Sequence, residues 1–304
     1  MRLLPKGMRE PISLGYLLAR ASDTLADTAG LEASLRSDML EGFLEVLNGG
    51  DRQEWLGRLA SEVTPKQQHE GEKKLLESMD GVFAWLDSLI TEPTQGVAME
   101  HYSSPGSDQS ISSQEHAAIL TVMGHILRGQ KLDIERFELR DDFHFTLDAE
   151  LEEYCYLVAG CVGEFWTEIG FISLGSFSKM DASRMNRWGA NYGKGLQLIN
   201  ILRDLPNDLK AGRSYLPGID QDKPETIMRE AERWRVRARE YLNDGFAYAD
   251  SLLQRRTRMA TALPGLIGER TLDLLDKADW SGLQEGVRIS RQQVYLSAWE
   301  AFWR

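Results

Sequence analysis

Residues 195–208 read GLQLINILRDLPND, and wound as a helix this stretch has one apolar and one polar side. Leu196, Ile199 and Leu202 form the apolar side, which we expect to face a core. At about 100° per residue, the polar side gathers four residues within about 80° of arc. These are Gln197, Asn200, Asp204 and Asp208, with Arg203 on their flank. Such a face is either solvated or part of a ligand site, because buried amides and carboxylates are costly without partners.

A second acidic helix face lies near the N-terminus, where residues 16–27 read YLLARASDTLAD. An aromatic ring, a cation and two carboxylates fall within about 60° of helix arc here. They are Tyr16, Arg20, Asp23 and Asp27. Taken alone, this face is more typical of a solvated surface with an Arg–Asp pair.

Together the two segments predict a metal-dependent diphosphate site. Each carries Asp-x-x-x-Asp, which places two carboxylates one turn apart, and two such helices facing each other would surround a cavity with four. Hard cations such as Mg²⁺, with Mn²⁺ as an alternative, suit these ligands and substrate phosphates. Arg20 and Arg203 would donate to phosphate oxygens. Inside an apolar bundle, this chemistry suggests ionisation of an allylic diphosphate. The bundle would shield the resulting carbocation from water.

Helical periodicity continues almost throughout the 304 residues, and nine prolines leave long stretches without helix breakers. The sequence predicts an all-α bundle of roughly eight to ten helices, forming one domain over residues 1–304. Gly49-Gly50 is expected to divide 31–60, residues 91–113 to form a loop, and 223–257, rich in Glu and Arg, to face the surface.

Composition excludes several other classes. The net charge of −12 disfavours nucleic acid, which needs basic patches. Cys155 and Cys161, about 9 Å apart on one helix, cannot form a disulfide. No run of about 18 apolar residues suggests a transmembrane helix, so we expect a cytoplasmic protein, with peripheral membrane contact left open. Segment 189–195 lacks the order of a phosphate-binding Walker loop.

Several further segments, in order, make the chain resemble the head-to-head trans-isoprenyl diphosphate synthases, meaning the squalene and phytoene synthases. Besides the two acidic regions, these are residues 4–7 (LPKG), 129–133 (GQKLD), 154–163 (YCYLVAGCVG) and 212–217 (GRSYLP). Gln130 stands where the family usually has Met. The resemblance implies a single isoprenoid-synthase-type helical bundle with a central apolar cavity.

The resemblance also implies roles for individual residues. Asp23, Asp27, Asp204 and Asp208 would hold Mg²⁺, while Tyr154, Arg20 and Arg203 would be catalytic. Substrate would be bound by Tyr16, Arg20, Gln197, Asn200, Arg203, Arg213 and Tyr215, with Ala159, Val162 and Gly163 lining the prenyl tunnel. The ordinary alternatives are a packed core tyrosine at 154 and close helix packing at Ala159, Gly160 and Gly163.

The implied reaction joins two prenyl diphosphates through a cyclopropylcarbinyl diphosphate. The residues 23–27 favour farnesyl diphosphate and a C30, squalene-like product via presqualene diphosphate. The alternatives are phytoene synthesis from geranylgeranyl diphosphate and a hydroxysqualene synthase acting on presqualene diphosphate. NADPH use and oligomeric state stay open, since neither has a sequence signal here.

Two departures from the family pattern favour a competing hypothesis, a non-catalytic scaffold or assembly factor. The N-terminal segment is expected to be short. Pro206, inside the second acidic region, is expected to bend the helix at a cost of roughly 3 kcal/mol and to re-aim Asp208.

Overall fold

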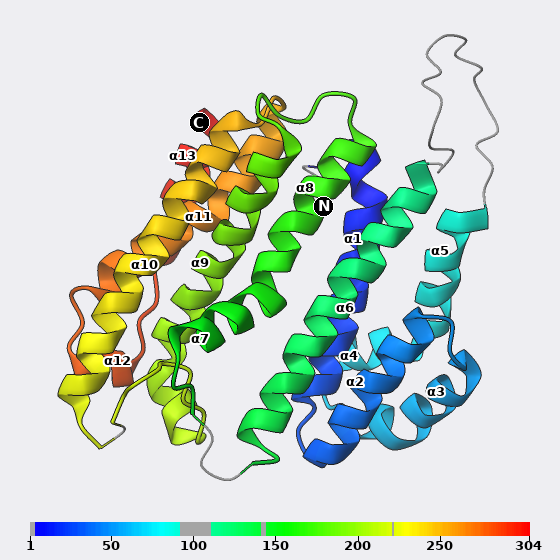
Figure 1. The fold of residues 1–304 in the computed structure, drawn as a ribbon, viewed down its shortest axis with the longest axis horizontal. Coiled ribbons are helices and arrows are strands. Elements are labelled where there is room, and N and C mark those ends of the chain that lie inside the picture. The colour runs from blue at the N-terminus through cyan, green and yellow to red at the C-terminus, as the bar shows by residue number, and fades with distance from the viewer. Residues whose placement is uncertain (1–3, 92–110, 141–143, 221) are drawn as a thin grey trace.

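The computed structural model describes residues 4–91, 111–140, 144–220 and 222–304, and helices dominate all four ranges (Figure 1). The N-terminal half contains α1 (Lys6–Asp27), α2 (Ala33–Leu47), α3 (Arg52–Arg58), α4 (Glu70–Glu77), α5 (Met79–Thr91) and α6 (Ile111–Phe137). The C-terminal half contains α7 (Asp148–Cys155), α8 (Cys161–Ser173), α9 (Ala182–Lys210), α10 (Pro224–Ser251), α11 (Arg255–Leu275), α12 (Trp280–Glu285) and α13 (Arg291–Trp303). Three short turns complete the set: the π-helical η1 (Leu59–Val63) and η3 (Tyr156–Gly160) and the 3₁₀-helical η2 (Thr64–Lys66).

The all-α prediction is confirmed. Within the described ranges the only β feature is an isolated bridge between Ser178 and Leu252. The segmentation is finer than eight to ten helices, because Ser78 separates α4 from α5 and Gly286, at φ 95°, ends α12. Gly49, also at positive φ, ends α2 as expected. Most of the predicted loop, residues 92–110, lies outside the described residues.

The apolar helical run from Asp148 to Ser173 lies at the centre of the bundle. It comprises α7, η3 and α8, and it packs against α6 on one side and α9 on the other (Figure 1). By length and hydropathy alone this run could cross a membrane, with 44% of its most apolar window buried in the fold. A core helix of a bundle meets the same criterion, so the finding is weak evidence for a span.

The prediction that residues 223–257 face the surface is wrong for one side of α10. A stripe with helical spacing, Ile227, Ala231, Trp234, Ala238 and Tyr241, is buried against α9. Most of the Glu and Arg residues lie on the other side of the helix, whereas Arg235 is buried and paired with Asp276. Their density concealed the buried stripe in the sequence.

Glycines allow α8 and α9 to approach until their backbones touch. A Cβ built on Gly163 would lie 1.9 Å from the Gly189 carbonyl oxygen, and one on Gly193 would lie 2.2 Å from the Ala159 oxygen. The packing interpretation of Gly163 is therefore correct. Cys155 and Cys161 are both free and buried, so the expected absence of a disulfide between them is confirmed.

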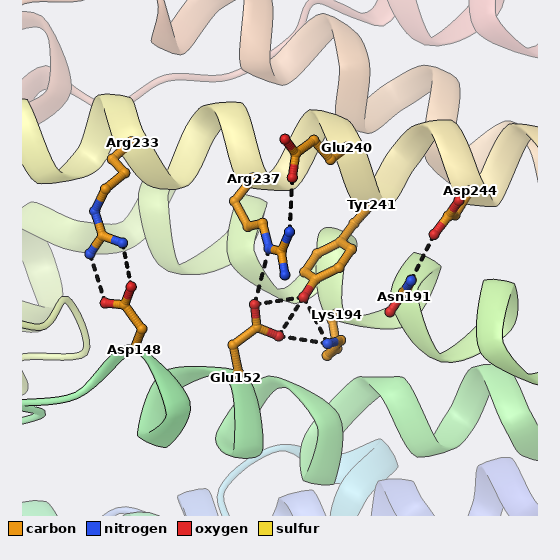
Figure 2. A network of polar contacts seen from close by, with 9 residues as sticks. All are labelled: Asp148, Glu152, Asn191, Lys194, Arg233, Arg237, Glu240, Tyr241 and Asp244. Atoms are coloured by element: carbon orange, nitrogen blue, oxygen red, sulfur yellow. Dashed lines mark hydrogen bonds and ion pairs between the residues drawn. The ribbon is translucent and has the colours of Figure 1, made fainter.

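A polar network joins α7, α9 and α10 (Figure 2). Lys194 Nζ donates to Glu152 Oε2 at 2.6 Å and to Tyr241 Oη at 2.8 Å. Tyr241 Oη and Arg237 Nε both donate to Glu152 Oε1. Burial would raise the pKa of Glu152, but the hydrogen bonds from Lys194 and Tyr241 outweigh it and lower that pKa. The network thereby fixes α7, two residues before Tyr154.

We expect Glu152→Ala to lower the free energy of unfolding by about 2–3 kcal/mol, because it leaves the half-buried Lys194 ammonium without its carboxylate. Urea denaturation measures this loss. The control is Arg128→Ala, which removes an exposed pair with Glu153 and should cost less than about 0.5 kcal/mol. Equal losses in the two variants would contradict the role of the network.

Candidate active site

A polar chamber of about 630 Å³ lies between the C-terminal end of α1, α6, α7 and α9. Its walls carry both charges. The acids include Asp23, Asp27 and Asp133, and the cations are Arg36 and Arg213. Such a mixture suits a ligand that carries both phosphate oxygens and bound cations.

Asp23 and Asp27 lie one turn apart on α1, as the sequence predicted, and both line the chamber. Burial, reinforced by the charge of Asp27, raises the pKa of Asp23 to about 6. Burial also raises the pKa of Asp27, although Arg213 and Arg36 oppose it. The charged form of both carboxyls is thus disfavoured, and a bound cation would stabilise it.

The second acidic region divides between two cavities. Gln197 lines the polar chamber. Burial raises the pKa of Asp208 to about 6 against the attraction of Arg213, with Asp204 and Asp133 raising it further. Asp208 does not itself line the chamber, but its carbonyl oxygen accepts a hydrogen bond from the amide of the lining residue Arg213 at 2.8 Å, and α9 continues past Pro206 to Lys210.

Asp204 has a different environment. Arg203 donates to both its carboxylate oxygens, at 2.9 and 2.6 Å. The pair lines a neighbouring pocket of about 410 Å³, formed with α11 and residues 286–289. The structure thus places Asp23 and Asp27 on the chamber wall and Asp208 next to the lining residue Arg213, and it pairs Asp204 with Arg203 at the neighbouring pocket.

Tyr154 is a packed core tyrosine, as the ordinary alternative expected, and it also forms part of the chamber wall. Its ring stacks on Tyr215, with centroids 5.0 Å apart. Tyr215 Oη in turn donates to Asp133 Oδ1 at 2.8 Å. Burial and the Asp133 charge raise the pKa of Tyr154 well above its ordinary value, so the phenol stays protonated.

An apolar cavity of about 320 Å³ adjoins the chamber, and Val158 lines both. Ala159, Val162 and Gly163 line this cavity, where the sequence predicted the prenyl tunnel. Val158 and Val162 follow Tyr154 at spacings of four. The π-turn η3 lies between Tyr154 and Val162, and along this segment Tyr154 lines the chamber, Val158 both cavities and Val162 the apolar cavity. An apolar cavity is therefore present beside the chamber, and one of its lining residues, Val162, is 41% exposed.

Three other predicted site residues line neither cavity. Tyr16 is 58% exposed, and Asn200 is also exposed. Arg20 forms an ion pair with Glu72 of α4. Their predicted roles in substrate binding stay predictions.

Four chamber residues escaped the sequence reasoning as site residues. Arg36 and Glu138 pair with each other, from α2 and the end of α6, and no local pattern marks them. Gln130 and Asp133 belong to the GQKLD segment. Their spacing of three, which places both on one helix face, was the available signal.

A family profile described as squalene/phytoene synthase matches residues 1–300. The chain belongs to this family.

Curated relatives show low identity to this squalene/phytoene synthase family member. Squalene synthase of Saccharomyces cerevisiae is 24% identical over 217 residues, 71% of this chain and 41% of that protein. Presqualene diphosphate synthase of Rhodopseudomonas palustris is 28% identical over 159 residues, which are 49% of this chain and 52% of that protein. Phytoene synthase 1 of Solanum lycopersicum is 24% identical over 174 residues, which are 53% of this chain and 42% of that protein. The matched regions span about half or less of the relatives' own lengths.

Solved structures agree on the fold. TcSQS in complex with the ligand BPH1237 superposes with a TM-score of 0.71 at 18% identity, covering 99% of this chain and 80% of that one. The squalene synthase HpnC from Alicyclobacillus acidocaldarius gives 0.56 at 17% identity, covering 90% and 85%. The all-α isoprenoid synthase fold is thereby shown.

The oxygen donors of this family member fit a hydrated Mg²⁺ better than a closed protein cage. Within the described residues, no three His, Cys, Asp or Glu side chains converge on one point. Gln130 Nε2 donates to Asp23 Oδ1 at 2.6 Å, yet its Oε1 is buried without a partner. Arg36 Nε is likewise buried and unpartnered. Mg²⁺ usually keeps waters and shares substrate phosphates, which would supply such partners.

Proton binding at the chamber should compete with Mg²⁺. The folded-state pKa values of Asp23 and Asp208 are about 6, above the ordinary 3.8. These two carboxyls therefore stabilise the metal-free fold fully below pH 4, and this contribution is lost as pH rises through 6. We expect the rise in Tm caused by Mg²⁺ to be small at pH 5 and full above about pH 7. Calorimetry across this pH range measures the rise in Tm. A rise of equal size at pH 5 would contradict Mg²⁺ binding by Asp23 and Asp208.

Proposed function

We propose that this protein is a Mg²⁺-dependent prenyltransferase that joins two farnesyl diphosphates head-to-head, through presqualene diphosphate, to a C30 product. One observation carries the proposal. In a squalene/phytoene synthase family chain, a carboxylate- and arginine-lined chamber joins an apolar cavity at Val158. A prenyl diphosphate has the same division into a polyanionic head and an apolar tail.

The polar chamber would hold the diphosphate. Asp23, Asp27 and Asp208 would hold Mg²⁺, with Asp204 joining them once released from Arg203. When bound, Mg²⁺ neutralises the charge that develops on the departing diphosphate. Arg36 and Arg213 would donate hydrogen bonds to the phosphate oxygens.

The apolar cavity would hold the prenyl chain and exclude water from the carbocation. Tyr154 lines the polar chamber four residues before the shared Val158, and its ring is held by its stack on Tyr215. Its protonated phenol presents an electron-rich ring and a hydroxyl to the carbon that ionises. The ring would stabilise the cation, and the hydroxyl could assist proton transfer.

The lining of the apolar cavity supports the shorter farnesyl chain. Its lining includes three bulky aromatic side chains, Trp166, Tyr192 and Tyr248. Tyr192 is held by a hydrogen bond to the Thr261 carbonyl oxygen, and Tyr248 by one to the Thr167 hydroxyl. Fixed rings of this kind limit the depth available to a longer geranylgeranyl chain.

The test is incubation with farnesyl diphosphate and Mg²⁺, with and without NADPH, followed by analysis of the hydrocarbons and diphosphates. We expect presqualene diphosphate or a C30 hydrocarbon, and no product after chelation. A C40 product from geranylgeranyl diphosphate alone would establish the phytoene alternative. Conversion of presqualene diphosphate to hydroxysqualene would establish the hydroxysqualene synthase alternative. If farnesyl diphosphate analogues do not bind in a metal-dependent way, the scaffold hypothesis is favoured.

A further inference from the structure

The helix α13 buries small residues and exposes large apolar ones, which is the reverse of an ordinary surface helix. Its buried side consists of two small residues, Ser297 and Ala301, packed toward α11. Its outer side carries large apolar side chains within about 120° of helix arc. These are Tyr295, Leu296, Trp299, Phe302 and Trp303, and the three largest exposures are 72% for Tyr295, 66% for Trp303 and 64% for Trp299.

The aromatic side chains of α13 form an ordered cluster. Trp299 and Trp303 meet edge to face at 5.6 Å, and Phe302 contacts Trp303 at 5.4 Å. The Arg255 guanidinium, from the start of α11, stacks 4.2 Å above the Phe302 ring and donates to the Phe302 carbonyl oxygen. An exposed cluster of this size and order is typical of a surface that meets a partner.

The charge around the cluster is opposite to that of the whole chain. Residues 250–268 and 290–304 form this corner of the fold, with α13 lying beside α11 (Figure 1) and Arg304 paired with Asp250. They contain five arginines and two acids, so 5 − 2 gives +3, in a chain of net charge −12. Arg256 and Arg291 are exposed. Tryptophan and tyrosine beside arginines match the interface of an anionic bilayer.

We propose that the outer face of α13 docks the protein peripherally on an anionic lipid surface, with Trp299 and Trp303 inserted among the headgroups and the surrounding arginines contacting lipid phosphates. The same corner adjoins the apolar cavity, because Ala260, Thr261 and Pro264 of α11 form part of its wall. Docking would bring this wall near the bilayer, where an apolar product dissolves. That advantage rests on the proposed function, whereas the docking itself does not.

Vesicle sedimentation tests the proposal. We expect the chain to bind vesicles of phosphatidylcholine mixed equally with phosphatidylglycerol, and to bind phosphatidylcholine alone much more weakly. Trp299→Ser with Trp303→Ser should weaken binding about tenfold or more. Arg256→Gln with Arg291→Gln should weaken it about 30-fold at low salt. The matched control, Val236→Ser with Arg229→Gln on the exposed side of α10, should bind as the parent does.

Three results would overturn the proposal. They are no sedimentation of the parent chain, unchanged binding by the tryptophan variant, and a dimer in solution that only the tryptophan substitutions dissociate. Turnover of farnesyl diphosphate in detergent is measured on the same preparations. The docking variants should retain it. A chain that sediments but shows no turnover would refute the proposed function and leave the docking in place.

Discussion

Asp23→Asn is expected to abolish most turnover while making the metal-free protein more stable. The pKa of Asp23 is raised to about 6, so the carboxylate is held in an unfavourable environment at neutral pH. Asparagine keeps an oxygen that accepts from Gln130 and removes the charge. A shift of about two pKa units sets a ceiling near 3 kcal/mol, and solvent screening lowers the expected gain to about 1–2 kcal/mol.

The same substitution removes a proposed Mg²⁺ ligand. Loss of about 4 kcal/mol of leaving-group stabilisation corresponds to about a 10³-fold fall in turnover of farnesyl diphosphate. Product analysis at saturating Mg²⁺ and calorimetry in chelator at pH 7.5 measure the two effects. Asp38→Asn, at an exposed site on α2, is the control and should change neither. Activity above a tenth of the parent, or a lower Tm in chelator, would contradict this account of the site.

Gly163→Ala is expected to give the largest loss of stability. The new methyl group would lie 1.9 Å from the Gly189 carbonyl oxygen and 2.3 Å from its carbon, so α8 and α9 must separate. Because a backbone rather than a flexible side chain blocks the methyl group, we expect a cost of about 2–4 kcal/mol despite the better helix propensity of alanine. Urea denaturation measures it.

Gly163 also lines the apolar cavity, so separation of the two helices should change how the prenyl chain is held. We expect KM for farnesyl diphosphate to rise in the fraction that stays folded. The controls are Gly57→Ala and Gly81→Ala, helical positions at which an added Cβ meets nothing within 4 Å. Each should stabilise the protein by about 0.5–1 kcal/mol. A Gly163→Ala protein as stable as these would show that the two backbones can separate freely.

Local periodicity predicted the helices well, because the apolar stripe of an amphipathic helix is a property of a few turns of chain. It predicted α10 as a helix, but the expectation that this helix faces the surface was wrong, because charged residues outnumber the buried stripe from Ile227 to Tyr241. It also missed the π-turn η3. One extra residue in a turn leaves little trace in hydropathy, although this turn carries Val158, which lines both cavities.

The acidic pairs followed from spacing alone, since residues four apart on a helix share a face whatever surrounds them. Which pairs meet in space did not follow. Asp23, Asp27 and Asp208 gather near Arg213, whereas Asp204 pairs with Arg203 toward the neighbouring pocket. Arg36 enters the chamber from α2 without any local signal.

The sequence by itself determined the helical class, the two acidic faces and the apolar helix between them, because each depends on residues a few positions apart. Only the tertiary structure decided that a polar chamber and an apolar cavity share Val158, and that the aromatic side of α13 faces outward. Both depend on how helices pack across long sequence separations. That packing is set by the backbone contact of Gly163 with Gly189 and by the volumes of many side chains together.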